Sequence, residues 1–292
     1  MAYFRKKCNL FDIFNYVFLF LMGTITLYPF LYVLTISLVP QGVYLKGGLF
    51  LFPSKISLEA YKVVLNDRFI YSALMSSTII TVAGTVCNLI LTSMAAYVLS
   101  KNDLKGCKVI MRLFIFTMYF SGGMIPSYLL MNQLHLIDTY WAVILTGTVS
   151  TYYILVMRTF FANLPASMEE AAVIDGASEL TVLIKIILPL SKPVLAALGL
   201  FFAVGHWNNY FTSMIYLNSR NKWPLQIVLR EILFETTSSI KGGADGTFSE
   251  GLRVVAPLRM ATVIVSIIPI TMVYPFLQKH FVKGVLIGAV KA

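Results

Sequence analysis

Two sets of residues have types suited to catalysis or metal binding, and neither forms a recognisable centre. His135 and Asp138 lie close together, as an acid–base pair requires, but nothing around them completes a site. Cys8, Cys87 and Cys107 lack metal-ligand spacing and imply no disulfide. The phosphate-binding pattern GxxxxGKS/T is absent, so we expect no ATP binding or hydrolysis by this chain. The sequence therefore predicts a protein that is not an enzyme and carries no cofactor or metal.

The run from His206 to Tyr210 concentrates amide and aromatic groups inside an apolar stretch. Such a polar cluster is not expected to face lipid. One interpretation is hydrogen bonding that holds helices together. The other is a path along which a polar ligand stacks on aromatic faces and bonds to amides. We take His206 as structural, and the candidate path residues are Trp207, Asn208, Asn209 and Tyr210.

The amino-acid composition indicates whether the chain folds in water or in a membrane. Only 12% of its 292 residues are charged and 58% are hydrophobic, with a mean hydropathy of +0.79. A soluble domain of this length cannot hide so much apolar surface, and composition also excludes disorder, a disulfide scaffold and a collagen-like chain. We expect an all-α polytopic membrane protein. Its net charge of +10 is scattered over loops, which favours membrane topology and anionic lipid over nucleic acid.

Gaps between charged residues locate the membrane spans, because a charge at the bilayer centre is costly. Six gaps reach the roughly 18 residues that a crossing helix needs. Basic clusters at Arg5–Lys7 and Lys101–Arg112 favour cytoplasmic placement of both termini. No soluble domain fits between the spans, so residues 1–292 form one transmembrane domain. The expected spans lie near 13–39, 70–99, 109–132, 139–161, 193–217 and 258–279, with outer loops 40–69 and 218–257 and a cytoplasmic loop 162–192.

The cytoplasmic loop carries its own helix signals and four of the 13 acidic residues of the chain. Ser167 and Glu170 have the spacing of a capping box, which predicts that Ser167 caps a helix of about two turns. Gly176 is placed to end that helix in a left-handed conformation. A second helix is expected from Ser178. Its predicted apolar stripe consists of Leu180, Leu183, Ile184, Ile187 and Leu188.

Three short motifs in this loop follow one another at a specific spacing. They are Glu170-Ala171-Ala172, Asp175-Gly176-Ala177 and Ile186-x-Leu188-Pro189. In this spacing the sequence resembles the EAA signature of bacterial ABC importer permeases. One departure is Leu183, where many relatives carry Phe, a conservative apolar exchange.

The resemblance extends over nearly the whole chain, to the carbohydrate-uptake branch on the maltose-permease side. The segments Gly122–Pro126 and His206–Tyr210 look most like permeases for complex or acidic oligosaccharides, of the alginate and aldouronate type. Further matching positions are Pro29, Leu136-x-Asp138-Thr139-x-Trp141 and Lys283-Gly284.

This resemblance implies a type I ABC importer permease whose EAA loop forms a coupling helix on a cytoplasmic ATPase. The implied partners are a second homologous permease subunit, two ATPase subunits that carry ATP and Mg²⁺, an extracellular solute-binding protein and an oligosaccharide substrate. The implied location is a bacterial cell membrane. Outer loop 218–257 would contact the binding protein, and the tail from residue 280 would reach toward the ATPase. The implied coupling residues are Glu170, Ala171, Ala172, Asp175, Gly176 and Ala177.

Two alternatives remain. An ABC permease for another small solute, such as amino acids or metals, is disfavoured only by the carbohydrate-type segments. An ion-coupled secondary transporter normally carries an intramembrane Asp, Glu or Arg, and the six gaps contain none.

Overall fold

The computed structural model describes residues 10–44, 55–101, 104–239 and 256–289. Within these ranges all regular structure is helical, as expected from composition. The chain divides into two compact units, one formed by residues 1–67 and 231–267 and the other by residues 68–230 and 268–292. The helices are α1 (Leu10–Ser37), α2 (Gln41–Tyr44), α3 (Glu59–Asn66), α4 (Arg68–Ser100), α5 (Cys107–Tyr119), α6 (Met124–Gln133), α7 (Tyr140–Thr146), α8 (Thr151–Ala162), α9 (Ala166–Ile174), α10 (Glu179–Val182), η1 (Leu183–Ile187), α11 (Leu188–Leu190), α12 (Lys192–Asn208), α13 (Phe211–Tyr216), η2 (Arg220–Lys222), α14 (Leu225–Ser239) and α15 (Ala256–Ala289).

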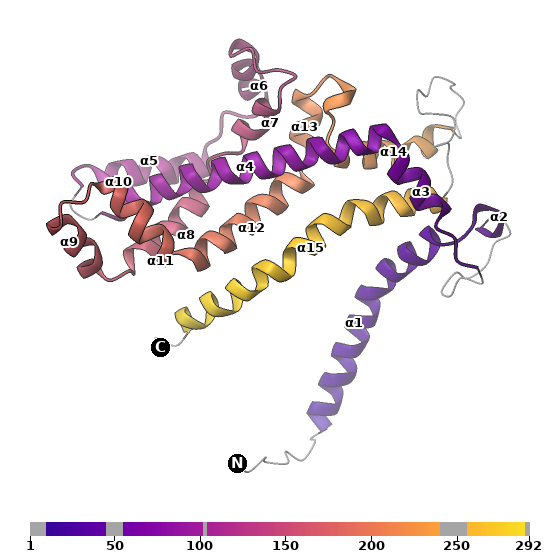
Figure 1. Cartoon of the computed structure of the whole chain (residues 1–292), viewed down its shortest axis with the longest axis horizontal. Coiled ribbons are helices and arrows are strands. Elements are labelled where there is room, and N and C mark those ends of the chain that lie inside the picture. The colour runs from indigo at the N-terminus through magenta and orange to yellow at the C-terminus, as the bar shows by residue number, and fades with distance from the viewer. Residues whose placement is uncertain (1–9, 45–54, 102–103, 240–255, 290–292) are drawn as a thin grey trace. The chain divides into compact units, whose positions relative to one another are not determined.

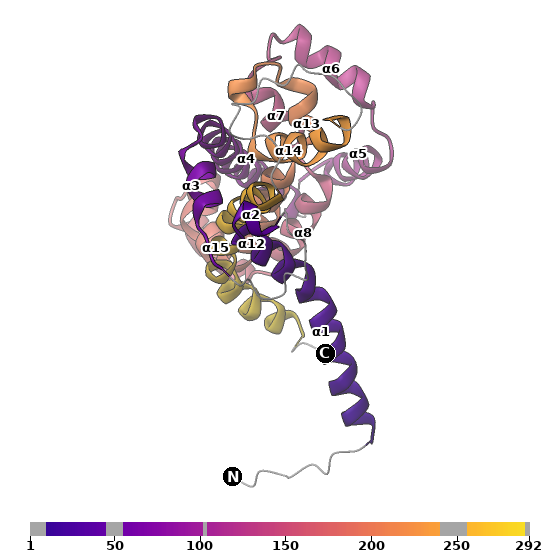
Figure 2. The same cartoon turned by 90° about the vertical axis from the view of Figure 1, so that its right-hand side faces the viewer.

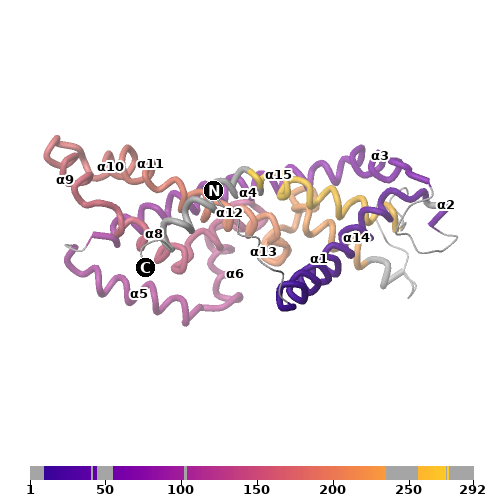
Figure 3. The backbone as a smooth tube through the Cα atoms, turned by 90° about the horizontal axis from the view of Figure 1, so that it is seen from below, coloured from indigo at the N-terminus to yellow at the C-terminus, as the bar shows by residue number. Residues whose placement is uncertain are grey.

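Three of the described helices are long and apolar enough to cross a membrane alone: α1, α4 and the part of α15 up to Val273. Figure 2 shows α1 as one uninterrupted helix. Three further spans become possible if each sharply bent pair of helices counts as one. The pairs are α5 with α6, bent by 111° (Figure 3), α7 with α8, bent by 60°, and the Glu179–Leu190 segment with α12, bent by 85°.

Helix α4 is the central helix of the second unit, and α8 and α12 pack along it (Figure 1). On its face toward α12, Gly84 lies against the His206 side chain, so the absence of a side chain at Gly84 allows close approach. Around the last turns of α4, buried side chains from α8, η1 and α12 form one apolar core. A second core near its other end joins α4 to α6, α7 and α13 through Ile80, Met131, Val143 and Tyr216. One continuous helix therefore connects two separate cores.

The helix expected over 193–217 is interrupted in the structure. Helix α12 ends at Asn208, and Asn209 has an extended backbone. The Asn209 side-chain oxygen accepts the Thr212 amide at 3.1 Å, which supports the start of the short helix α13. An amide side chain that competes for backbone groups thus divides a stretch that hydropathy alone reads as continuous.

The segments expected as outer loops contain helices. Residues 40–69 include α2 and α3, and residues 218–257 include η2 and all of α14. In the first unit, the Ser37 hydroxyl lies 2.6 Å from that of Tyr61, and the Ser57 amide donates to the Leu38 carbonyl at 2.8 Å. The Gly-rich stretch 241–246 and the outermost tail residues 290–292 lie outside the described residues.

Candidate functional site: the segment 162–192 and the polar run 206–210

Helix α9 begins at Ala166, two residues earlier than the predicted capping box requires, because a Ser167 cap would place the first helical residue at Met168. It starts at Ala166 after Pro165, which fills the N-cap position, and no side chain caps it. Ser167 therefore lies inside the first turn, where its hydroxyl is not placed to receive the Glu170 amide. The capping-box prediction is wrong because Pro165, with its fixed φ, already directs the chain into the helix.

The end of α9 follows the predicted left-handed cap. Gly176 has φ of +80°, a conformation that strains any residue with a Cβ. The Ala177 amide donates to the Ala172 carbonyl at 2.9 Å and the Gly176 amide to the Val173 carbonyl at 3.0 Å. This pair of bonds is the Schellman motif. It explains structurally why Gly176 stands between Asp175 and Ala177.

The two faces of α9 differ. Ala172 is partly buried and packs, with Ala177, against the core around the end of α4. Glu170 and Ala171 are exposed, and Ile174 is 85% exposed. The small residues of the EAA motif therefore serve two surfaces. Ala172 packs within the chain, whereas Glu170, Ala171 and Ile174 face outward.

The second helix begins at Ser178, as predicted. The Ser178 hydroxyl accepts the Thr181 amide at 3.4 Å, but the helix changes to π-helical geometry over Leu183–Ile187. The wider turn moves the apolar stripe away from its predicted line. Leu183 and Ile187 are buried together with Val182, whereas Leu180 and Ile184 are more than half exposed. The predicted stripe is correct at Leu183 and Ile187 and wrong at Leu180 and Ile184.

A cluster of four polar side chains joins this segment to the last turns of α4. The Tyr97 hydroxyl donates to Glu179 Oε2 at 2.6 Å, and Glu169 Oε1 lies 3.1 Å from the same hydroxyl. Lys101 pairs with Glu169, and its Nζ lies 3.2 Å from Glu179 Oε2. The ammonium also sits 4.6 Å from the centre of the Tyr97 ring. Two carboxylates from α9 and α10 thus share one cation and one hydroxyl from α4 and the residue that follows it.

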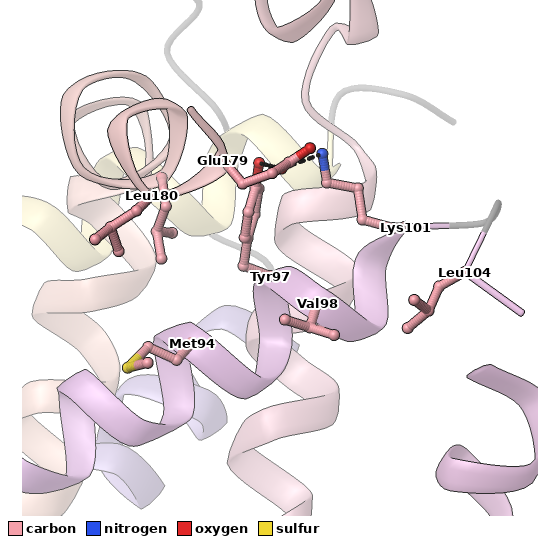
Figure 4. A pocket seen from close by; sticks show the side chains of 8 residues that line it. Met94, Tyr97, Val98, Lys101, Leu104, Glu179 and Leu180 are labelled. Atoms are coloured by element: carbon pink, nitrogen blue, oxygen red, sulfur yellow. Dashed lines mark hydrogen bonds and ion pairs between the residues drawn. The ribbon is translucent and has the colours of Figure 1, made fainter. Parts of the chain in front are cut away.

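Three of these four polar side chains line an apolar groove of about 440 Å³ (Figure 4). The groove runs between the end of α4 and α10, and Tyr97, Glu179 and Lys101 meet at its rim. Its apolar walls are formed by Met94, Val98, Leu104, Leu180 and Leu183.

The first residue of the polar run, His206, is structural, as the sequence suggests. Its Nε2 lies 3.2 Å from Asn88 Oδ1, and the Asn88 amide donates to the Gly147 carbonyl at 3.2 Å. Asn88 is buried in the middle of α4, and Gly147 lies at the bend between α7 and α8. This chain of contacts supplies a partner for a carbonyl that the bend releases.

The four candidate path residues occupy different surroundings. Trp207 is only 7% exposed and lines an apolar cavity of about 180 Å³ with α4 and α15 residues. Asn208 is exposed, and Asn209 supports α13. The Tyr210 ring is 37% exposed and lies 4.7 Å beneath the guanidinium of Arg230. The structure does not gather these four residues into one site.

Asp138 is the centre of a different polar site. Its Oδ1 accepts the amides of Asn218 and Ser219 at 3.0 and 2.8 Å, and Lys222 Nζ lies 2.9 Å from Oδ2. Burial raises the pKa of this carboxyl, but hydrogen bonds from Ser219, Lys222 and Asn218 outweigh it and hold that pKa well below its usual range. Asp138 therefore ties the α6–α7 connection to the segment after α13.

Sequence reasoning missed Tyr97 and Lys101 as parts of the loop site. Lys101 was visible only as a member of a basic cluster, and Tyr97 as an aromatic residue within a span. Their partners Glu169 and Glu179 lie 68 to 82 residues further on, a separation over which no periodicity operates. Among the described residues, no three His, Cys, Asp or Glu side chains gather as metal ligands do.

Comparison with known proteins gives a match over almost the full length. Residues 8–287 match the family model of binding-protein-dependent transport system inner membrane components. The polygalacturonan/rhamnogalacturonan transport system permease protein YtcP of Bacillus subtilis (strain 168) is 41% identical over 98% of this chain and 99% of its own length. The arabinooligosaccharides transport system permease protein AraQ of the same organism is 28% identical over 94% of each chain.

A solved structure resembles the fold closely. A chain in the crystal structure of a bacterial ABC transporter that imports the acidic polysaccharide alginate superposes with a TM-score of 0.87 and 33% identity, over 96% of this chain and 100% of that one. The similarity therefore covers both compact units.

Proposed function

The chain belongs to the family of binding-protein-dependent transport system inner membrane components, and from that premise we propose how it couples and what it carries. It is a multi-pass permease component of an ABC importer. We propose six spans with both termini in the cytoplasm, residues 162–192 on the cytoplasmic side and α9 as the coupling helix. Residues near 13–39, 70–99, 109–132, 139–161, 193–217 and 258–279 contribute these spans.

The observation that carries the coupling role is the exposed face of α9. A short helix outside the apolar spans presents Ile174 at 85% exposure, next to Val173 at 51%. Glu170 and Ala171 are also exposed. An apolar patch with one carboxylate and a small residue suits a protein partner better than water. The patch is held rigidly by the Gly176 cap, so it can follow the movement of an ATPase as one body.

The proposed cargo is an oligosaccharide, with acidic oligosaccharides favoured. Support comes from YtcP, named for polygalacturonan and rhamnogalacturonan transport, and from the alginate importer. Tyr210 and Arg230 fit such a cargo, because an aromatic face stacks on a sugar ring and a guanidinium pairs with a carboxylate. Trp207 is buried and lines an apolar cavity, so we propose that it packs beside the path.

The proposed assembly contains a second, homologous permease subunit, two cytoplasmic ATPase subunits and an external solute-binding protein. Six spans enclose half of a path, which is why a second permease is required. ATP and Mg²⁺ are held by the ATPase subunits, and this chain carries neither.

Uptake in cells tests the proposal directly. Cells that lack this chain should fail to accumulate radiolabelled oligogalacturonate, and the wild-type chain should restore accumulation. Restoration by a chain without residues 166–177 would contradict the coupling role. Accumulation of labelled amino acids, with none of oligogalacturonate or arabinooligosaccharide, would favour a permease for another small solute.

A further inference from the structure

The end of α4 and the coupling segment are joined by polar contacts across a groove. On the groove side, apolar walls leave open space between α4 and α10. Across its rim, Lys101 and Tyr97 hold Glu179 of α10 (Figure 4). The same two residues also hold Glu169 of α9. At the groove, ion pairs and hydrogen bonds therefore connect α4 to α9 and α10.

The charges in this cluster do not balance. Two carboxylates meet one ammonium, and the Tyr97 hydroxyl has one hydrogen to donate, which points to Glu179 at 2.6 Å. Among the residues that the structure describes, Lys101 is the one cation paired with both carboxylates, and without it two like charges would face each other around Tyr97. Loss of Lys101 should therefore break the polar link from α4 to both α9 and α10, although Ala172 and Ala177 would still pack against the core.

Helix α4 is suited to pass a movement onward. It is unbroken over 33 residues and packs along α12 and α8. At its other end, the Ser72 hydroxyl donates to the Asn221 carbonyl at 2.9 Å and the Ser77 hydroxyl accepts the Leu225 amide at 2.8 Å. A displacement applied at Lys101 thus reaches η2 and α14 through one rigid element.

We propose that Lys101 and Tyr97 form a latch with Glu169 and Glu179 that makes α4 move together with the coupling helix. Lys101 is a positioning residue, which acts through the two carboxylates. This inference rests on the proposed coupling role of α9 and adds to it the element that receives the motion.

Spin-label distances within the complete transporter test the latch. The three native cysteines are replaced by alanine, and labels are attached at Ala166→Cys in α9 and Val86→Cys in α4, both exposed positions. Distances are measured without nucleotide and after trapping with ATP and vanadate. We expect the wild-type chain to give one narrow distribution that is the same in both states, because α9 and α4 move as one unit.

Lys101→Met should give a distribution that broadens and shifts on trapping, whereas Lys101→Arg should restore the wild-type result, since a guanidinium bridges two carboxylates. Lys105→Met is the matched control, because Lys105 is exposed in the same segment and does not belong to the latch. A narrow, unshifted distribution in Lys101→Met would overturn the inference.

The two proposals fail in different ways. If the latch is wrong and the coupling role is right, Lys101→Met keeps the wild-type distances while Glu170→Lys still loses ATP-driven uptake. If the coupling role is wrong, Glu170→Lys transports normally whatever the distances show.

Discussion

Gly84 of α4 lies directly against the imidazole of His206 in α12. A Cβ added at position 84 would sit 2.5 Å from His206 Nε2 and 2.7 Å from Cε1. The imidazole cannot simply swing aside, because Nε2 lies 3.2 Å from Asn88 Oδ1. The close approach of α4 and α12 therefore depends on the absence of a side chain at position 84.

Gly84→Ala should destabilise the fold by about 1–3 kcal/mol, as overpacking usually does. Thermal unfolding of the purified protein in detergent measures this effect. Gly199→Ala is the matched control, because its Cβ would lie 3.5 Å from Leu89, an ordinary contact. Equal unfolding midpoints for the two variants would refute the close-packing argument.

Gly176→Ala should loosen α9 through backbone strain alone. No atom lies within 4 Å of the added Cβ, but φ of +80° costs a residue with a side chain about 1–2 kcal/mol. Amide hydrogen exchange over residues 166–177 should become faster. The exchange rate of Gly176→Asn should lie between those of the wild type and Gly176→Ala, since Asn tolerates this conformation better than Ala. Identical exchange in all three proteins would contradict the left-handed cap at Gly176.

Asp138 and its partners Asn218, Ser219 and Lys222 form what we call the Asp138 clamp. We expect its contribution to the stability of the fold to depend on pH only in acid. The pKa of this carboxyl is lowered in the folded state, so its contribution is complete above the unfolded value of about 3.9 and is lost as the pH falls through the folded pKa. Unfolding midpoints of the wild type should show no contribution from Asp138 between neutral pH and about pH 5.

Asp138→Asn tests the charge within that clamp. Asn tolerates φ of +60° and keeps an oxygen for the two amides, but it loses the ionic hydrogen bond to Lys222. We expect a loss of about 1.5–3 kcal/mol, typical of hydrogen bonds to charged groups. In a double-mutant cycle with Lys222→Met the losses should fail to add, and strict additivity would show that the pair does not interact.

Tyr210 and Arg230 should affect the apparent affinity for an acidic oligosaccharide. Tyr210→Ala removes both the aromatic face that is proposed to stack on a sugar ring and the ring beneath the Arg230 guanidinium. A loss of about 0.5–1 kcal/mol in cargo binding, the size of an exposed cation–π contact, corresponds to a rise in KM of about two- to fivefold. Tyr210→Phe keeps the ring and should behave like the wild type. Uptake of labelled oligogalacturonate at graded concentrations measures KM; an equal effect of both substitutions would argue against stacking on the ring.

A feature of the fold can be predicted from the sequence when the residues that determine it lie close together along the chain. Hydropathy located α1, α4 and α15, and the left-handed cap at Gly176 follows from residues a few positions apart. The start of α9 was misplaced because Pro165 competes with Ser167 for the same role. The interruption at Asn209 was missed because hydropathy does not register a side chain that bonds to backbone.

The candidate sites divide in the same way. The EAA motif is local and was recognised, but its distribution over two faces depends on packing of Ala172 and Ala177 against distant helices. The Tyr97–Glu179 and Lys101–Glu169 contacts join residues far apart in sequence, and the Asp138 clamp joins residues about 80 positions apart. Such pairs are determined by the tertiary fold, which a single sequence does not disclose.

The most direct test of the central claim is the amount of oligosaccharide imported per ATP hydrolysed by the complete transporter in vesicles, with the binding protein present. Glu170→Lys places a cation on the exposed face of α9 and should abolish ATP-driven uptake while the permease still inserts into the membrane. Glu170→Gln, which keeps the size of the side chain, should give a smaller loss. Unchanged import per ATP in Glu170→Lys would contradict the assignment of α9 as the coupling helix.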